Sequence, residues 1–427
     1  MTGSIRIAVS GGGLAGASLV HALLQYNHLD VHIFESASEF KEAGAAIGVN
    51  RAALAALDLI GPSAAQSLQN AGAVPQQSVR FMLAQGDHPE TQFDVAKERY
   101  PGQHLTNIVH RAAFLRELLS KVPPERMHAS KKLERVERAG NGENGPITLH
   151  FADGSTHECD ILIGADGIHS IVRKIILGDT DPAASPRNTG WWCIMALKPY
   201  EEARACLGDE YVDVNDASEY GWVGDGTFLM HNVLSGGSLV QFVVTGSDDP
   251  TKMSNQWNRM VAAEEVRKLY AEWPPRLRNA VEKLLCDKAE QPAIYLWEHP
   301  PAHTYVSGPI CVTGDAAHAT TPWQGSGAGM SIEDSLILST LLGNANTPVQ
   351  ACKGLRIYDK LRRARTQQVV ESSRGTGVIL TGKGEDTGLE LEKLRKNTMP
   401  RWDFIIDFDV KKHRDEAVEM MAKEVGQ

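Results

Sequence analysis

The chain contains no block of positive charge, and its 43 Lys and Arg residues are outnumbered by 53 Asp and Glu residues, which gives a formal net charge of −10. This balance argues against a nucleic acid or an anionic membrane surface as partner. The six cysteines form no Cys-x-x-Cys pair, so neither a disulfide framework nor a metal site is indicated. No apolar run of about 18 residues and no leader pattern is present. We therefore expect a cytoplasmic protein that does not associate with membranes.

The composition is that of a globular protein, with 42% hydrophobic and 22% charged residues. A length of 427 residues is large for one hydrophobic core, so the sequence predicts two domains or one domain with a large insertion. No internal repeat or low-complexity tract divides the chain further.

A glycine-rich turn lies close to the N-terminus. The apolar segment 5–9 predicts a strand, Gly11-x-Gly13-x-x-Gly16 follows it, and a helical run comes next. These glycines allow a tight turn, a close approach of the backbone to a pyrophosphate, and close packing of helix on strand. Glu35 ends the next predicted strand, 19 residues after Gly16, where a carboxylate can accept hydrogen bonds from a ribose. The stretch predicts a dinucleotide site, and by itself it leaves NAD and FAD open.

Two further turns have the same layout of strand, glycine-rich turn and helix start. Residues 164–173 follow an apolar strand and carry Asp166, and residues 314–330 follow another and carry Asp315. The free N–H groups of a helix N-terminus attract phosphate or another anionic oxygen. The three turns are therefore candidates for one shared ligand site.

The segment between the second and third turns has a different sequence pattern, in which short predicted strands are separated by glycine-containing turns. Residues 77–97 also read as a β-hairpin, and the basic residues of the helix predicted over 358–374 suggest a solvated face. We expect a nucleotide-binding domain in two parts, 1–180 and 300–375, a β-rich domain over 181–299, and a helical tail over 376–427.

Taken together, the three turns resemble the FAD-dependent aromatic hydroxylases, the single-component flavoprotein monooxygenases that include salicylate hydroxylase and phenol-dearomatising members. The resemblance covers about residues 1–375. It implies an α/β fold, with a Rossmann-like FAD-binding domain, an inserted antiparallel β-sheet substrate domain and C-terminal helices. It also implies NADH or NADPH and O2 as co-substrates, and hydroxylation of a phenol or aromatic acid through a flavin C4a-hydroperoxide, with salicylate-type decarboxylation as one option.

The resemblance also implies which residues contact the cofactor. The first turn and Glu35 take the ADP half of FAD, Asp166 lies near the pyrophosphate, Asp315 meets the ribityl and phosphate region, and Pro322 lies beside the flavin ring, where it contributes to catalysis. The implied FAD-binding residues are Gly11, Gly13, Ala15, Gly16, Glu35, Ala46, Gly48, Arg111, Asp166, Asp315, Gly325, Gly327 and Ala328.

The substrate region departs from the dearomatising relatives, which carry an Arg in the strand after the middle motif and a Tyr beside a His in the strand facing the flavin. At the aligned place in the strand after the middle motif, this chain has Trp191-Trp192-Cys193-Ile194-Met195, which contains no Arg. In the strand expected to face the flavin, it has His231-Asn232, with no Tyr beside the His. We expect His231 and Asn232 to contact the substrate, with a structural role for His231 as the alternative. Trp191, Trp192 and Trp323 are expected to stack on the aromatic ring, or else to belong to the core.

Two alternative functions remain open at this stage. One is an FAD-dependent reductase or dehydrogenase on the same fold, and the other is a monooxygenase of a bulkier secondary-metabolite aromatic. The halogenase motif Trp-x-Trp-x-Ile-Pro is absent from the sequence. The expected oligomeric state is a monomer or a homodimer, and the choice between NADH and NADPH is open.

Overall fold

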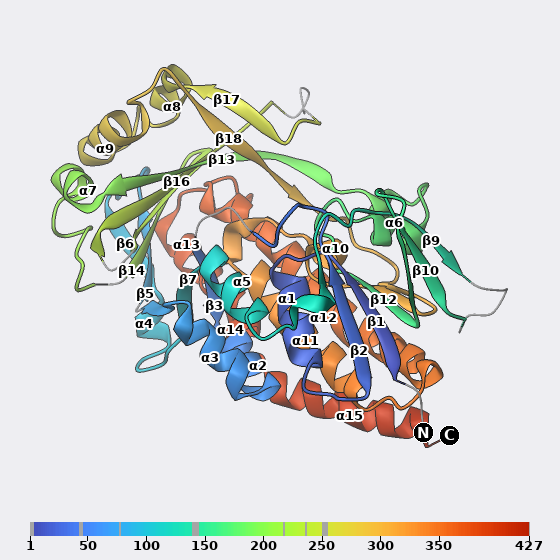
Figure 1. The fold of residues 1–427 in the computed structure, drawn as a ribbon. Helices are drawn as coiled ribbons and strands as arrows, with labels where there is room; N and C mark the ends of the chain where they lie inside the picture. Colours follow the sequence, from blue (N-terminus) through green and yellow to red (C-terminus); the bar gives the residue numbers. More distant parts are fainter. Residues whose placement is uncertain are drawn as a thin grey trace.

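The computed structural model describes residues 4–41, 46–76, 78–138, 145–216, 218–234, 237–249 and 255–426. They form two large sheets with helices packed around them (Figure 1). None of the helices in these ranges is both long and apolar enough to cross a bilayer.

The first large sheet has six strands in the order β19-β20-β12-β1-β2-β8, and every neighbouring pair except β19 and β20 is parallel. Its central strands are nearly continuous apolar runs, which is typical of parallel strands that are buried on both faces. Their bounds are Ile5–Ser10 (β1), Leu29–Phe34 (β2), Met127–His128 (β8), Ile161–Gly164 (β12), Val306–Ser307 (β19) and Ile310–Val312 (β20).

Different layers cover the two faces of this sheet (Figure 1). Helices α1 (Leu14–Leu23) and α11 (Gly327–Gly343) pack against each other on one face. A small antiparallel sheet of β9 (Leu133–Arg138), β10 (Ile147–Phe151) and β11 (Thr156–Cys159) covers the other. The three predicted turns follow β1, β12 and β20, so parallel packing brings them to one edge of the sheet.

The second large sheet has eight strands in the order β17-β18-β13-β16-β15-β14-β5-β6. All its pairs are antiparallel except β14 with β5. Strands β5 and β6, the hairpin predicted within 77–97, come from the segment that was assigned to the nucleotide domain, so this sheet is not confined to 181–299. The bounds are Ser78–Leu83 (β5), Thr91–Val95 (β6), Arg187–Pro199 (β13), Ser218–Gly224 (β14), Thr227–Leu234 (β15), Leu239–Ser247 (β16), Asn258–Ala262 (β17) and Glu290–Glu298 (β18).

The eight-stranded sheet buries its outer face under three helices and turns its inner face toward the rest of the molecule. The outer helices are α7 (Tyr200–Leu207), α8 (Ala263–Leu269) and α9 (Pro275–Leu285), which share a core with the sheet. A three-stranded sheet, with β3 (Ala46–Asn50), β7 (Thr106–His110) and β4 (Val74–Gln76), lies between the two large sheets in space (Figure 1).

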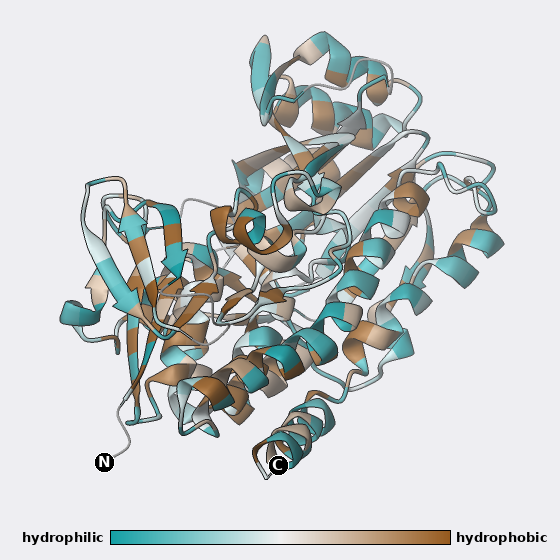
Figure 2. Cartoon of the chain, turned by 90° about the vertical axis from the view of Figure 1, so that its right-hand side faces the viewer, coloured by the Kyte–Doolittle hydropathy of each residue, from teal (hydrophilic) through white to brown (hydrophobic). Residues whose placement is uncertain are grey.

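The C-terminal helices begin with α12 (Pro348–Leu380), which is longer than the helix predicted over 358–374 and contains the expected domain boundary at 375. Gly377 within this helix leaves room for Trp323, since a Cβ there would lie 2.4 Å from the Trp323 Nε1 atom. The surrounding helices show alternating hydrophilic and hydrophobic bands, as expected when one side is buried (Figure 2). The remaining helices are α2 (Arg51–Ile60), α3 (Pro62–Asn70), α4 (Ala96–Arg99), α5 (Arg111–Leu119), α6 (Ile171–Leu177), α10 (Asp315–His318), α13 (Leu391–Asn397), α14 (Pro400–Ile406) and α15 (Val410–Val425).

Candidate active site

A cavity of about 1090 Å³ lies between the carboxyl ends of the parallel strands and the inner face of the eight-stranded sheet. This is the usual ligand position in open α/β sheets. All three predicted turns reach it. The implied FAD-binding residues that line it are Gly11, Gly13, Ala15, Glu35, Ala46, Gly48, Arg111, Asp166, Asp315, Gly325, Gly327 and Ala328.

The first turn needs its glycines for two different contacts. Gly11 has a φ of +112°, and a Cβ there would lie 2.1 Å from the Ala165 carbonyl oxygen of the second turn. Gly16 does not line the cavity; a Cβ there would lie 2.0 Å from the Gly11 carbonyl oxygen, so Gly16 allows α1 to pack closely on the turn. The absence of a side chain at Gly11 thus lets the first and second turns approach each other.

The N-terminus of α1 is open toward the cavity. Its N-cap residue, Gly13, has no side chain to accept the first helical N–H groups, and the first turn of the helix contains no acidic residue. Glu35 stands beside it: its Oε2 atom accepts a 2.7 Å hydrogen bond from the Gly12 N–H, and Oε1 accepts one from the Ala37 N–H. The amides at this helix N-terminus suit a phosphate, and the fixed carboxylate suits a ribose hydroxyl.

The second turn is built differently. Asp166 lines the cavity, but its Oδ2 atom accepts hydrogen bonds from the N–H groups of Ile171 (2.8 Å) and Val172 (3.2 Å), and Ser170 donates to Oδ1. Burial raises the pKa of Asp166, and these hydrogen bonds oppose the rise. Asp166 therefore caps α6, which is the alternative that the sequence left beside a position near the pyrophosphate.

Arg173 of the same motif connects the second turn with the third. Its guanidinium is buried and donates to the carbonyl oxygens of Ala316 (3.0 Å) and Ala317 (2.6 Å), which lie in the turn after β20. The two turns are thus held together by a side chain that never reaches the cavity.

The third turn rests on Asp334 of α11. The Asp334 Oδ2 atom accepts hydrogen bonds from the Thr313 hydroxyl (3.1 Å), the Gly314 N–H (3.3 Å) and His318 (2.6 Å). Arg362 of α12 completes the cluster, with Nε 2.7 Å from Asp334 Oδ1. His318 has a structural role in this cluster. Arg362 is fully buried, so the prediction of a solvated face is wrong at this position.

The N-terminus of α11 also opens into the cavity. Its N-cap residue, Ser326, makes no capping hydrogen bond through its side chain, and no acidic residue lies in the first turn. Gly325, Gly327 and Ala328 surround it on the cavity side. Two uncapped helix N-termini and a glycine cradle thus face one cavity, which fits a cofactor with a pyrophosphate at one end and an electron-rich ring at the other, as FAD has.

The inner face of the eight-stranded sheet forms the wall opposite these turns. Side chains alternate between the two faces of a strand, so the residues of β13–β16 that line the cavity lie two positions apart where a strand contributes more than one. Most of the wall is apolar. Three polar residues, Glu219, Asn232 and Gln241, form one row across neighbouring strands, and Thr245 lies farther along β16. The apolar members are Val79, Phe81, Cys193, Met195, Phe228, Met230, Val243 and Leu296.

The same alternation separates the two residues of the His231-Asn232 pair. Asn232 lines the cavity, whereas His231 is 1% exposed on the outer face, where its Nε2 atom accepts a 3.1 Å hydrogen bond from Trp222 Nε1 and its ring stacks on Tyr220. Burial lowers the pKa of His231 to about 3, so its imidazole is neutral. The expectation that His231 contacts the substrate is therefore not met, and the structural alternative describes it.

The three tryptophans lie in different environments. Trp323 lines the cavity beside Pro322. Trp191 packs edge-on against Trp323, with ring centroids 5.9 Å apart, and is not part of the cavity lining; Trp192 lies in the core on the outer face of the sheet. Only Trp323 of the three is therefore positioned to contact a substrate ring.

Several cavity residues were missed by the sequence reading. Glu219 and Gln241 lie in strands whose register the sequence did not determine. Both are paired with Asn232, so the strand pairing would have identified them. Trp402, Ile405 and Ile406 of α14 also line the cavity. The apolar run around Trp402 signalled a docked helix without indicating where it docks.

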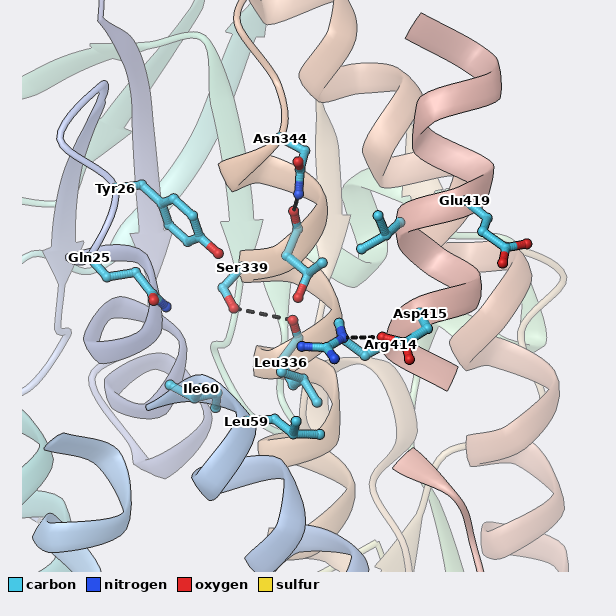
Figure 3. A pocket seen from close by; sticks show the side chains of 12 residues that line it. Gln25, Tyr26, Leu59, Ile60, Leu336, Ser339, Asn344, Arg414, Asp415 and Glu419 are labelled. Carbon is cyan, nitrogen blue, oxygen red and sulfur yellow. Dashed lines mark hydrogen bonds and ion pairs between the residues drawn. The ribbon is translucent and has the colours of Figure 1, made fainter. Parts of the chain in front are cut away.

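A smaller hollow of about 550 Å³ lies between α1, α2, α11 and α15. Figure 3 shows its polar lining, with Tyr26 and Asn344 on one side and the neighbouring Arg414 and Asp415 on the other. It contains no residue of the three turns, so the larger cavity is the candidate active site.

The glycine cradle, the two helix N-termini and the adjoining apolar wall define the class of protein, one that binds a dinucleotide cofactor beside an apolar substrate pocket. The chain belongs to the family described as the FAD binding domain, with residues 4–373 matched.

Two curated proteins illustrate the similarity. The chain is 35% identical over 425 residues to 6-methylsalicylate 1-monooxygenase of Aspergillus terreus, covering 98% of this chain and 92% of that protein. It is 31% identical over 450 aligned positions to salicylate hydroxylase of Sarocladium schorii, covering 96% and 91%.

A solved salicylate hydroxylase substrate complex matches with a TM-score of 0.84 at 26% identity, covering 98% of each chain. The enzyme is therefore an FAD-dependent aromatic monooxygenase of the salicylate hydroxylase type. These findings confirm the predicted family, fold class and FAD cofactor.

Proposed function

We propose that the enzyme uses NADH or NADPH and O2 to hydroxylate a small phenolic ring, with decarboxylation where the ring carries a carboxylate at the attacked position. The relatives named for 6-methylsalicylate and salicylate support this substrate class. The C4a-hydroperoxide route that the family resemblance implies is part of the proposal.

One observation carries the proposal: the uncapped N-terminus of α11 and the apolar sheet wall belong to the same cavity. The helix N-terminus would stabilise the negative charge that a reduced flavin carries at its N1–C2=O edge. When bound, FAD supplies the oxygen-transfer chemistry. Phe228, Met230, Val243 and Trp323 would exclude water from the reacting ring, which limits the leakage of peroxide.

The protein's other contributions are binding and orientation. The amides at the start of α1, together with Glu35 and Arg111, would hold the ADP half of the cofactor, and Pro322 and Gly325 would lie beside its ring. Asn232, rather than His231, would hydrogen-bond the substrate, because it is the member of the pair that faces the cavity.

The test is an assay of the purified holoenzyme with NADH or NADPH, ¹⁸O2, and a panel containing salicylate, 6-methylsalicylate and m-cresol. We expect an FAD spectrum and a product that gains one ¹⁸O atom. Anaerobic, substrate-dependent NAD(P)H oxidation without oxygen incorporation would instead favour a reductase.

A further inference from the structure

Three polar residues of the cavity wall, Glu219, Asn232 and Gln241, form a row that crosses three adjacent strands; a further polar lining residue, Thr245, is separated from Gln241 on β16 by the apolar Val243. Glu219 of β14 pairs with Asn232 of β15, and Asn232 pairs with Gln241 of β16. Directly paired residues have Cβ atoms about 5 Å apart, so a single small ring can reach all three. We call this row the polar stripe. The next row on the same face contains Phe81, Met230 and Val243 and is apolar.

The polar stripe lies at the end of the cavity where the flavin ring is expected. Its outer neighbour Gln76, on β4, pairs with Thr106 of β7 and also lines the cavity. A Cβ at Gly48 would lie 3.4 Å from Thr106 Cγ2 and 3.9 Å from the Gly325 carbonyl oxygen. The stripe therefore adjoins the segments that the proposed function places beside the flavin.

Among the described residues of this wall that line the cavity, Glu219 is the one that carries a carboxyl group. Burial raises the pKa of Glu219 to about 7, and a hydrogen bond from Gln76 opposes the rise. The side chains that neighbour it are Val79 on β5, Asn232 on β15 and Gln76 on β4, and none of them is charged. A general base with a pKa near the working pH is the most effective proton acceptor.

Cationic groups lie elsewhere in the cavity. Of the described lining residues, the Lys and Arg side chains are those of Arg111, Lys131 and Lys132, and none belongs to the eight-stranded sheet. His231, the other titratable residue expected at this wall, faces outward. A substrate anion would thus find no counter-ion on this wall, whereas a hydroxyl group would find an acceptor.

We propose that Glu219 is a catalytic residue that accepts the proton of the substrate's ring hydroxyl, while Asn232 and Gln241 donate hydrogen bonds to the resulting phenolate oxygen. This inference deepens the proposed function and rests on it. The substrate O–H bond breaks, the proton passes to a Glu219 carboxylate oxygen, and the electron pair stays on the ring oxygen. After the ring is hydroxylated, it recovers its aromaticity by losing a ring proton to water, or CO2 where the attacked carbon carries a carboxylate, and the same oxygen regains its proton from Glu219. Glu219 is then a carboxylate again, and the step requires no added oxidant or reductant.

The test compares wild type, Glu219→Gln and Glu219→Asp in single-turnover hydroxylation of m-cresol, with 6-methylsalicylate as the second substrate. Glu219→Gln should lower the hydroxylation rate about 100-fold, the low end of the range for general-base catalysis. The wild-type rate should fall below about pH 7, as Glu219 becomes protonated, and the Gln variant should lose this acid limb. Glu219→Asp should retain it and recover part of the rate.

A more acidic substrate separates a proton-transfer role from a structural one. With 2-fluoro-5-methylphenol, the fluorinated analogue of m-cresol, the rate deficit of Glu219→Gln relative to wild type should shrink below about tenfold, because less help is needed to remove the proton. Flavin content and substrate-free NAD(P)H oxidation should match those of wild type. Glu210→Gln, at an exposed carboxylate paired with Arg276, is the matched control and should behave as wild type.

The outcomes distinguish the two proposals. If wild type hydroxylates either substrate but Glu219→Gln keeps its rate and its acid limb, the role of Glu219 is overturned while the proposed function stands. An equal deficit with the fluorinated analogue would also overturn it, as would loss of flavin from the variant. If wild type hydroxylates neither substrate, the proposed function fails and this inference fails with it.

Discussion

Replacing Arg362 with methionine should destabilise the enzyme and loosen its FAD site, although Arg362 does not touch the cavity. Its guanidinium is fully buried, 2.7 Å from Asp334 and 2.8 Å from Glu333. Asp334 in turn accepts a hydrogen bond from the N–H of Gly314 in the third turn. The substitution leaves two buried carboxylates without their main counter-ion at the point where that turn is held.

The expected loss can be worked out from this arrangement. Removing one partner of a buried ion pair costs about 3–5 kcal/mol. With an unfolding entropy of about 2.1 cal/mol/K per residue, a chain of 427 residues has about 0.9 kcal/mol/K, so the melting temperature should fall by about 3–6 °C. The matched control is Arg363→Met, whose side chain is partly exposed and pairs with Asp359 at 2.9 Å. It should cost under about 0.5 kcal/mol and shift the melting temperature by under about 1 °C.

The pH dependence has a defined sign. Burial alone would raise the pKa of Asp334, but the charges of His318 and Arg362 hold it well below its usual value. A lowered folded-state pKa contributes stability that is present above the unfolded value of about 4 and is lost as the pH falls toward the folded value. Thermal melts of the two variants and wild type between pH 3 and 7, with flavin content measured after gel filtration, test this reasoning. Equal melting temperatures and flavin contents for Arg362→Met and Arg363→Met would refute it.

Three further predictions concern the cavity. Gly11→Ala should abolish FAD retention, because its Cβ would lie 2.1 Å from the Ala165 carbonyl oxygen at a φ of +112°; retained flavin absorbance would contradict this. Asp315→Ala should lower FAD occupancy several-fold in the same assay, and an unchanged flavin content would refute the role expected for that turn. Asn232→Leu should raise KM for the aromatic substrate by up to about tenfold, the value of one lost hydrogen bond, whereas His231→Gln should change KM by under about twofold. If steady-state kinetics showed the larger change in KM for His231→Gln, the orientation of β15 would be disproved.

The cofactor site could be predicted closely from the sequence because it depends on backbone. Gly11, Asp166 and Asp315 each mark a strand that ends in a turn, and parallel pairing of β1, β12 and β20 brings those turns together. Such contacts need small residues at fixed spacings, which remain visible in a sequence. The function that the turns imply was therefore accessible before the fold was known.

The substrate wall was less predictable because it depends on strand register. His231 and Asn232 are adjacent in sequence, yet they face opposite sides of the sheet, and a shift of one residue exchanges them. The polarity of the two residues did not reveal which one faces the cavity, because the His231 ring has a hydrogen-bond partner, Trp222, on the outer face. Glu219 became recognisable only through its pairing with Asn232.

Long-range packing explains the other differences. Arg362 resembles the neighbouring surface cations in sequence, and only the packing of α12 on α11 reveals that it faces Glu333 and Asp334. The same holds for Trp402 of α14, which reaches the cavity from the C-terminal helices. Neither placement has a local signal, since each depends on elements distant in the chain.

The most direct test of the account is the fate of molecular oxygen in the wild-type holoenzyme. With ¹⁸O2, NADH or NADPH, and a phenolic substrate such as m-cresol or 6-methylsalicylate, mass spectrometry should find one ¹⁸O atom in each product molecule, at a yield close to the NAD(P)H consumed. Consumption of NAD(P)H with an unlabelled aromatic compound, whether peroxide forms or not, would contradict the claim that this cavity holds FAD and substrate together for oxygen transfer.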